Sequence, residues 1–321
     1  MPKHINSSLY TRFAGLRDFL SLKLTGAYPR PINVHVEINN TCNLDCVMCP
    51  RDRLTRRLTL MDDDLFRSVV RQLAGMGVPS VSLFLFGDPL CHPRLDEMVA
   101  YAAEHGVAPV LNTNAMALTE ERGRKLLDAG LKTVIFSVDG VTPEVFAEVR
   151  RGGDLERVRA NILRFLELAA ERRPRPATVV QFAVSNINEH EVDAFRAFWE
   201  GKVDRLKFTR VTEYAGIEGL KTYEYKTLER RPCPDTWSKM VILADGTVTT
   251  CCLDLNGELG MGDAAATPLR DLWRSPRWRT LRRAHRRLNF AEYPVCDACP
   301  MPLLYAANLA DRSADELPER S

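Results

Sequence analysis

Three cysteines in the first part of the chain, Cys42, Cys46 and Cys49, have the spacing Cys-x-x-x-Cys-x-x-Cys and follow an apolar segment from Asn33 to Ile38. A cubane [4Fe-4S] cluster has four irons, so three thiolates leave one iron open to a ligand from outside the protein. Tetrahedral zinc is the alternative, but a structural zinc site fills all four positions and usually takes its ligands as separated pairs. The sequence has no fourth cysteine near this triplet. The spacing therefore favours a [4Fe-4S] cluster with one open iron.

A second group of cysteines lies in the last third of the chain. It consists of Cys233, the adjacent Cys251 and Cys252, and a closing pair, Cys296 and Cys299. A Cys-x-x-Cys pair is a common clamp for structural zinc and for iron-sulfur clusters. Adjacent residues on a strand face opposite sides, so we expect only one of Cys251 and Cys252 to reach the metal. Four thiolates would saturate a cluster and suit it to electron transfer, with structural zinc as the alternative.

Length and composition indicate a chain that can bury a full core. It has 321 residues, 45% of them hydrophobic, and a net charge of +2, so we expect neither a nucleic acid nor a membrane as partner. The first residues lack the apolar core of a signal peptide, and the longest apolar stretch, Val81 to Phe86, is too short to span a bilayer. We therefore expect a cytoplasmic protein whose clustered thiols hold metal rather than form disulfides.

The elements that must position these cysteines repeat one pattern: a short apolar run, an amphipathic segment, and Gly followed by a hydrophobic residue. This pattern is typical of βα units. We expect strands at Asn33–Asn39, Ser80–Phe86, Ala108–Asn112, Thr133–Val138, Thr178–Val184 and Arg205–Phe208. Gly77 marks the end of one helix and Thr142-Pro143 the start of another. These units predict an α/β fold, either a partial (β/α)6 TIM-like barrel or an open doubly wound sheet.

The pattern changes after the last unit, and the chain divides into four expected segments. They are an N-terminal helical arm (residues 1–30), a partial β/α barrel (31–215), a small C-terminal α+β metal domain (216–305) and a polar tail (306–321). A hairpin marked by Asp245-Gly246 is expected within the α+β segment.

The first cysteine triplet and its surroundings resemble the radical S-adenosylmethionine (radical SAM) enzymes over the run Asn40-Thr41-Cys42-Asn43-Leu44-Asp45-Cys46-Val47-Met48-Cys49-Pro50. In that family, the amino and carboxylate groups of SAM chelate the open iron. The resemblance implies reductive cleavage of SAM to a 5′-deoxyadenosyl radical, which abstracts a hydrogen atom from the substrate. It also implies an external one-electron reductant, a flavodoxin or a ferredoxin.

Further segments at successive strand ends match SAM-binding motifs of the family. Phe86-Gly87-Asp88-Pro89 is similar to Gly-Gly-Glu-Pro, with Phe and Asp in place of the first Gly and the Glu. Ser137-Val138-Asp139-Gly140 is similar to Ser-Ile-Asp-Gly, and Arg150 lies where relatives place an arginine on the SAM carboxylate. The resemblance implies that SAM is contacted by Met48, Gly87, Asp88, Asn114, Ser137, Asp139 and Arg150.

The second cysteine group resembles the SPASM domain, or its shorter "twitch" form, which carries an auxiliary [4Fe-4S] cluster. The similarity rests on Asp245-Gly246-x-Val248-x-x-Cys251, on Leu272-Trp273, and on Arg282 with His285. It implies two [4Fe-4S] clusters. The implied ligands are Cys42, Cys46 and Cys49 for the SAM-binding cluster and Cys233, Cys251, Cys296 and Cys299 for the auxiliary one.

The chain most resembles the small dehydrogenases that oxidise aminocyclitols or sugars in antibiotic pathways. We therefore expect an oxidoreductase whose radical removes hydrogen from a carbinol carbon of a small polar substrate. A base takes the hydroxyl proton, and the auxiliary cluster accepts the remaining electron, which gives a ketone. The candidate bases, at or after the late strands, are Lys207, Arg210 and Glu213.

Two alternatives stay open. A radical SAM maturase would crosslink, epimerise or oxidise a ribosomal peptide, but only about 40 residues precede Cys42, too few for a peptide-recognition domain in front. A non-catalytic iron-sulfur or zinc module would not need the SAM-contacting residues, such as Gly87 and Arg150.

Overall fold

The computed structural model describes residues 28–211 and 230–299. The predicted N-terminal arm, the predicted tail, the predicted boundary at 215–216 and the candidate base Glu213 lie outside these ranges, so these expectations stay predictions. Within the described part of the chain, no helix is long and apolar enough to cross a membrane.

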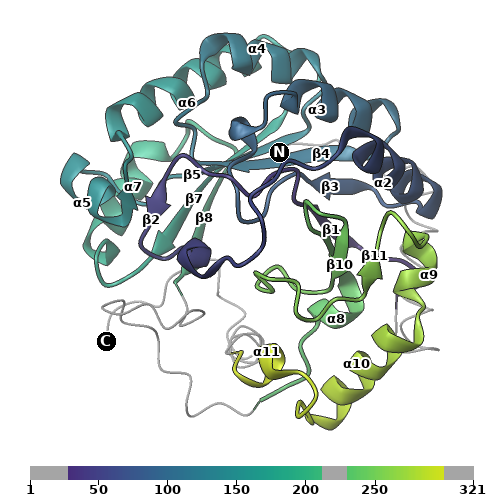
Figure 1. The fold of residues 1–321 in the computed structure, drawn as a ribbon. Helices are drawn as coiled ribbons and strands as arrows, with labels where there is room; N and C mark the ends of the chain where they lie inside the picture. Colours follow the sequence, from purple (N-terminus) through teal and green to yellow (C-terminus); the bar gives the residue numbers. More distant parts are fainter. Residues whose placement is uncertain (1–27, 212–229, 300–321) are drawn as a thin grey trace.

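A nine-stranded sheet of order β11-β10-β9-β1-β3-β4-β5-β7-β8 forms the centre of the described molecule (Figure 1). Its strands are β1 (Asn33–Val36), β3 (Ser80–Ser82), β4 (Ala108–Thr113), β5 (Thr133–Ser137), β7 (Ala177–Val184), β8 (Arg205–Arg210), β9 (Lys239–Ile242), β10 (Thr247–Thr249) and β11 (Gly262–Asp263). The six predicted strands are confirmed, and neighbours among them pair in parallel. Strand β3 is shorter than predicted, because the chain after Ser82 leaves the ladder toward the loop that follows β1.

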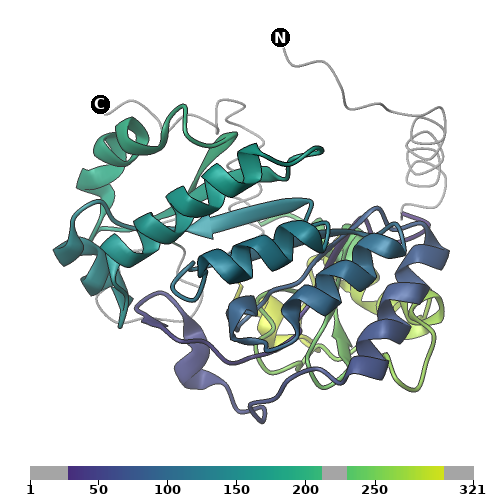
Figure 2. The same ribbon diagram turned by 90° about the horizontal axis from the view of Figure 1, so that it is seen from above.

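Helices of the βα units lie on one side of the sheet (Figure 1). They are α2 (Asp63–Met76), α3 (Leu95–Glu104), α4 (Glu120–Asp128), α5 (Pro143–Val149), α6 (Leu155–Ala170) and α7 (Val192–Trp199). Helix α2 packs beside α3, α3 beside α4, and α4 beside α6 (Figure 2). A doubly wound sheet would carry helices on both faces, so the arrangement is a partial TIM-like barrel.

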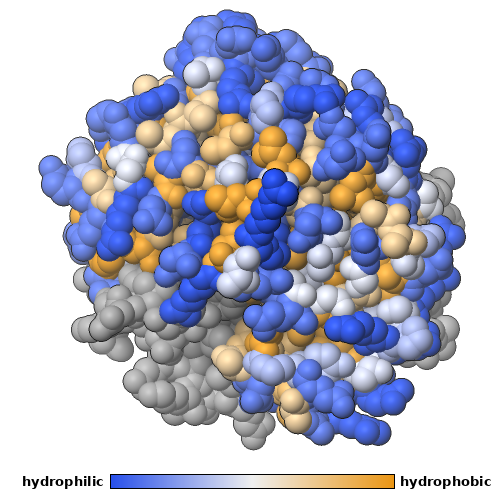
Figure 3. All heavy atoms as spheres, in the orientation of Figure 1, coloured by the Kyte–Doolittle hydropathy of each residue, from blue (hydrophilic) through white to orange (hydrophobic). Residues whose placement is uncertain are grey.

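The predicted helix signals act as expected. The Thr142 hydroxyl caps α5 by accepting a hydrogen bond from Val145 N, and Pro143 is its first residue. Helix α2 ends at Gly77, whose φ of +72° is in the left-handed region. Figure 3 shows hydrophilic side chains over the outer helices and apolar side chains nearer the middle of the view.

The C-terminal segment continues the barrel sheet. Strand β9 pairs in parallel with β1, from Asn33 opposite Lys239 to Val36 opposite Ile242. Strand β10 then returns antiparallel to β9, through the predicted turn in which Gly246 has a φ of +91°. The remaining short elements of this segment are α8 (Asp235–Ser238), α9 (Leu269–Trp273), α10 (Pro276–Arg287) and α11 (Pro294–Asp297).

Side-chain alternation gives the sheet two different faces. Val34 and Val36 of β1, like Leu206 and Phe208 of β8, pack into the core shared with the helices. Because successive side chains on a strand point to opposite faces, the residues between them point away from the helices. We call this second face the inner face. Its residues include His35, Ser137, Gln181, Lys207 and Lys239.

Candidate active site

The first cysteine loop is held by a short antiparallel pairing. Strand β2 (Asp45–Cys46) pairs with β6 (Arg150–Arg151), which places Cys46 opposite Arg150. The backbone N–H of Val47 donates to Val149 O at 3.0 Å, and that of Cys49 donates to Cys46 O at 3.0 Å. The following 3-10 helix, η1 (Pro50–Arg53), begins directly after Cys49. This pairing brings Arg150 to the cysteine loop.

Two of the three thiols receive hydrogen bonds from predicted site residues. Asn114 Nδ2 donates to Cys42 Sγ at 3.8 Å, and Arg150 Nη1 donates to Cys46 Sγ at 3.7 Å. Burial raises the pKa of the Cys46 thiol to about 11, and the Arg150 charge opposes this shift. A thiolate at Cys46 therefore needs further positive charge, which iron would supply. Donors aimed at sulfur and one guanidinium fit a ligand set for an iron-sulfur cluster.

Arg150 also forms a buried ion pair. Its Nη2 lies 2.5 Å from Asp139 Oδ2, and the other oxygen of Asp139 accepts from Ala183 N at 2.7 Å. The Arg150 Nε is buried without a hydrogen-bond partner. The Arg150 guanidinium thus contacts both the Cys46 thiol and the Asp139 carboxylate, and its Nε–H can still donate to a ligand. Its predicted contact with the SAM carboxylate stays a prediction.

Gly87 and Asp88 hold neighbouring loops together. A Cβ on Gly87 would lie 2.4 Å from Asn39 O and 2.6 Å from Thr41 O, so only glycine lets these two backbones meet. The Asp88 carboxylate accepts from Leu90 N, Thr113 Oγ1 and Asn114 N at 2.7–2.9 Å. These donors use most of the roughly four acceptor positions of a carboxylate. The Asp88 carboxylate thus orders the loop after β4, and its predicted contact with SAM stays a prediction.

The remaining predicted SAM contacts lie around the same edge of the sheet. Ser137, at the end of β5, donates its hydroxyl to Asn112 Oδ1 at 2.6 Å. Asn114 is buried directly after β4, and Met48 is half-buried within the cysteine loop. The structure thus gathers the predicted residues at the carboxyl ends of β1, β3, β4 and β5, and their contacts with SAM stay predictions.

The second cysteine group surrounds a cavity of about 70 Å³. Its lining includes Cys233, Cys251, Cys252, Cys296, Cys299 and His285. This volume is several times the roughly 10–15 Å³ that one water needs. Within the described ranges, no three Cys, His, Asp or Glu side chains lie close enough together to hold a single metal ion. Burial raises the pKa of the Cys233 and Cys296 thiols to about 12. A donor set of buried and half-buried cysteines around a space larger than a water fits a metal cluster.

The argument from strand alternation fails at Cys251 and Cys252. Strand β10 ends at Thr249, so the two cysteines lie in a turn and both border the cavity. Their surroundings differ nevertheless. Cys251 Sγ accepts a hydrogen bond from Leu253 N at 3.3 Å, whereas Cys252 Sγ accepts from the Lys239 ammonium at 3.3 Å. Cys251 also packs against the core. These contacts support Cys251 as the ligand.

His285 is a residue of this site that the sequence reasoning did not assign. It is buried on α10, and its Nδ1 accepts a hydrogen bond from Cys233 N at 3.3 Å. Burial, with the nearby Arg230 charge, lowers the pKa of His285 to about 4. The pattern Arg282 with His285 contained this signal. Arg282 itself braces the segment, since its Nε donates to Thr236 O at 2.9 Å and its guanidinium lies 4.3 Å from the Trp273 ring centroid.

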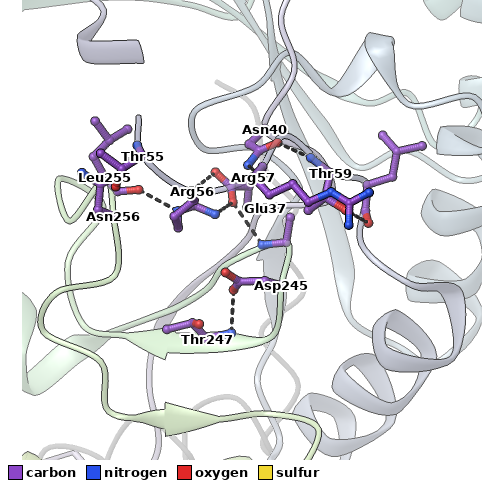
Figure 4. Close-up of polar contacts among 12 residues, drawn as sticks. Glu37, Asn40, Thr55, Arg56, Arg57, Thr59, Asp245, Thr247, Leu255 and Asn256 are labelled. Carbon is purple, nitrogen blue, oxygen red and sulfur yellow. Dashed lines mark hydrogen bonds and ion pairs between the residues drawn. The ribbon is translucent and has the colours of Figure 1, made fainter. Parts of the chain in front are cut away.

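A buried polar bridge joins the loops that follow the two cysteine groups (Figure 4). Arg56 forms two hydrogen bonds with Glu37, at 2.9 and 3.0 Å, and its Nε donates to Leu255 O at 2.8 Å. The same carboxylate accepts from Ala244 N at 3.0 Å. Nearby, Thr55 N donates to Asn256 Oδ1 at 2.8 Å. The chain after Cys49 is therefore fastened to the chain after Cys252.

Two of the three candidate bases can be located. Lys207 is exposed on the inner face of β8, and Arg210 ends the same strand. Partial desolvation lowers the pKa of Lys207, and the charges of Arg205 and Lys239 lower it further. A guanidinium does not deprotonate in proteins, so Arg210 is unsuited to take a proton. The third candidate, Glu213, lies outside the described residues.

The chain matches two families. The Radical SAM superfamily profile matches residues 36–198, and an iron-sulfur cluster-binding domain, SPASM, matches residues 233–300. A GTP 3′,8-cyclase from Chlorobaculum tepidum is 29% identical over 179 residues, which are 54% of this chain and 52% of the cyclase. The chain thus spans about half the length of that relative.

Two solved structures share the fold. BtrN, in complex with AdoMet and 2-DOIA, has a TM-score of 0.57 and 18% identity, over 84% of this chain and 92% of its own. Streptococcus suis SuiB, bound to precursor peptide SuiA, has a TM-score of 0.69 and 17% identity, over 88% of this chain and 73% of its own.

These matches confirm the family and both kinds of cofactor. SAM binds together with one SAM-binding [4Fe-4S] cluster, and the C-terminal domain implies an auxiliary [4Fe-4S] cluster. Since the superfamily profile covers half of the chain and the cysteine loop lies inside it, this chain belongs to the radical SAM superfamily and carries a SPASM domain.

Proposed function

We propose that this protein is a radical SAM oxidoreductase that converts a C–H/OH carbon of a small polar, aminocyclitol-like or sugar-like substrate to a ketone. The observation that carries the proposal is that the two cysteine groups lie near opposite ends of the strands in one sheet. Strand β1 leads from its carboxyl end toward Cys42. Strand β10 runs antiparallel to β9, whose partner is β1, and leads toward Cys251 at the other end. The inner face lies between the two groups.

The proposed reaction balances across these sites. When bound, SAM and its cluster supply a 5′-deoxyadenosyl radical, and the auxiliary cluster supplies an electron acceptor. Oxidation of a carbinol removes one hydrogen atom, one proton and one electron. In this chain, Cys42, Cys46 and Cys49 would hold the first cluster, and Cys233, Cys251, Cys296 and Cys299 would saturate the second. The inner face would orient the carbinol, and a base at or beyond β8 would take its proton.

Anaerobic reconstitution of the full chain tests the proposal. With dithionite, SAM and candidate substrates deuterated at the carbinol carbon, we expect 5′-deoxyadenosine that carries deuterium, together with a ketone product. A protein with full iron content that forms no 5′-deoxyadenosine would remove both the oxidoreductase and any other radical SAM activity. The physiological electron donor is proposed to be a flavodoxin or ferredoxin, which should replace dithionite in the same assay.

Maturation of a ribosomal peptide is the second candidate function. The likeness to SuiB, whose structure contains a precursor peptide, supports it at the level of the fold. The same assay distinguishes the candidates, because a maturase would transfer deuterium from a labelled peptide and leave deuterated small carbinols unchanged.

A further inference from the structure

Polar side chains from several strands meet on the inner face. Ser137 of β5 lies in register with Gln181 of β7, which lies in register with Lys207 of β8. Toward the opposite edge of the sheet, β1 contributes His35 and β9 contributes Lys239 to the same face. Strands β1 and β8 are not neighbours in the sheet. The partial barrel curves these strands around one interior, and the charge of Lys207 contributes to the lowering of the His35 pKa.

Lys207 carries the one inner-face ammonium without a counter-ion among residues 28–211 and 230–299. No hydrogen bond or ion pair within these ranges engages its amine, and the same holds for the Gln181 side-chain amide. Lys239, in contrast, pairs with Asp235 at 2.6 Å. An exposed ammonium beside a half-buried amide, neither with a partner in these ranges, is a polar site open to a ligand.

Among the described residues, two carboxylates on the same side of the sheet are engaged elsewhere. Glu37 is bound by Arg56, and Asp139 is bound by Arg150. The charges that lower the pKa of Lys207 are those of Arg205 and Lys239, and both are positive. The described part of the inner face is therefore basic around Lys207, although the whole chain is almost neutral, with a net charge of +2.

We propose that Lys207, with the Gln181 amide beside it, binds an anionic group, a carboxylate or a phosphate, of the substrate. This inference rests on the proposed function, because it places the group on the inner face between the two cysteine sites. It also narrows the substrate class. An ammonium held near Lys207 would be repelled, so an acidic sugar-like substrate fits the site and an aminocyclitol does not.

This role differs from that of a general base. A residue that binds an anion acts on substrate and transition state alike, so its loss raises KM and leaves kcat nearly unchanged. Loss of a base lowers kcat. An ammonium that donates to a charged group contributes enough binding free energy that we expect a roughly 10- to 100-fold weaker affinity in Lys207→Gln.

Calorimetry on the reconstituted full chain tests the inference without a reductant, so its outcome does not depend on SAM cleavage. In saturating SAM, the protein is titrated with inorganic phosphate, acetate, glucuronate, glucose and glucosamine. We expect phosphate, glucuronate or both to bind, glucose to bind more weakly, and glucosamine not to bind. Affinity should fall in Lys207→Gln and largely survive in Lys207→Arg. The exposed Lys132, changed to Gln, is the matched control and should bind like the wild type.

The set of ligands distinguishes a phosphate from a carboxylate as the anionic group. Binding of phosphate alone assigns a phosphate group, and binding of glucuronate and acetate alone assigns a carboxylate. Equal affinity in wild type and Lys207→Gln overturns the inference, as does tighter binding of glucosamine than of glucuronate. Anions that bind without SAM but not in saturating SAM would also overturn the inference. Lys207 would then bind the SAM carboxylate instead of the substrate. If an acidic substrate is turned over, a fall in kcat at unchanged KM in Lys207→Gln would assign the base role instead.

Discussion

The two cysteine sites of this chain are built differently. The first lies on a loop whose thiols receive side-chain donors from neighbouring loops, namely Asn114 and Arg150. The second group lines a cavity bordered by α10 and α11, where His285 contacts the Trp237 and Phe290 rings. The first site is thus polar and adjoins predicted SAM contacts, whereas the second gathers its cysteines around a largely apolar cavity.

This difference matches the number of thiols. Three cysteines leave an iron open, and an open iron needs polar neighbours that orient its external ligand. Four or five cysteines around one cavity leave no iron for a substrate, and a saturated cluster suits an electron carrier. The two sites therefore make different demands on the protein, and substitutions should affect them separately.

Removal of one thiol from each site is expected to have the largest effect. Cys46→Ala should abolish 5′-deoxyadenosine formation, because the SAM-binding cluster loses a ligand. Cys296→Ala should leave SAM cleavage intact but abolish net oxidation of substrate, because the auxiliary acceptor is lost. Both products are measured by chromatography after anaerobic reconstitution. Full oxidation by a folded Cys296→Ala protein would reject the electron-acceptor role.

Arg150→Gln should come next in size and should act on the first site. Removal of one partner of a buried ion pair leaves Asp139 charged and unpaired, which typically costs about 3–5 kcal/mol of unfolding free energy. We also expect the loss of SAM binding, measured by calorimetry. The adjacent and exposed Arg151 is the control, since its change to Gln should alter the unfolding free energy by less than about 0.5 kcal/mol. Equal stability of both variants would contradict the proposed importance of the pair.

Sequence patterns were sufficient for the parallel strands and for the grouping of the first site. Each βα unit carries its own local signals, such as the cap at Thr142 and the glycine at Gly77, so its position does not depend on distant residues. The predicted SAM contacts follow strand ends, and parallel strands end at one edge.

Local sequence patterns did not predict which strands from distant parts of the chain lie next to each other in the sheet. The apolar runs Asn33–Val36 and Lys239–Ile242 each look like strands, but nothing in either run specifies that they are neighbours. The turn at Cys251 and Cys252 was missed because the end of β10 depends on contacts of the following loop with Asp254. Glu37 did carry a signal, since a charged residue in a buried apolar run requires a partner, yet the sequence does not identify Arg56 as that partner.

Acid should destabilise the fold through His285 at the second site. The folded-state pKa of His285 is about 4, below its ordinary value of 6.5. Below pH 6.5 the unfolded chain binds the extra proton first, so the stability that His285 contributes above pH 6.5 is lost as pH falls toward 4. By pH 5 the loss should be roughly 2 kcal/mol. Urea unfolding of the cluster-free chain at pH 7 and pH 5 measures it. His285→Gln should flatten this dependence, whereas the exposed His190→Gln should not.

An effect of similar size is predicted for the bridge between the two sites. Arg56→Lys keeps the charge opposite Glu37 but loses the bidentate hydrogen bonding to its carboxylate and the hydrogen bond to Leu255 O. This loss should cost about 1–3 kcal/mol of unfolding free energy. Because the bridge fastens the loop after Cys49 to the loop after Cys252, the variant should also convert less substrate per 5′-deoxyadenosine formed. Arg57→Lys, at an exposed neighbouring position, should change neither quantity. A variant that loses stability but converts as much substrate per 5′-deoxyadenosine as the wild type would show that the bridge is structural only. The two cysteine sites would then act without depending on their fixed separation.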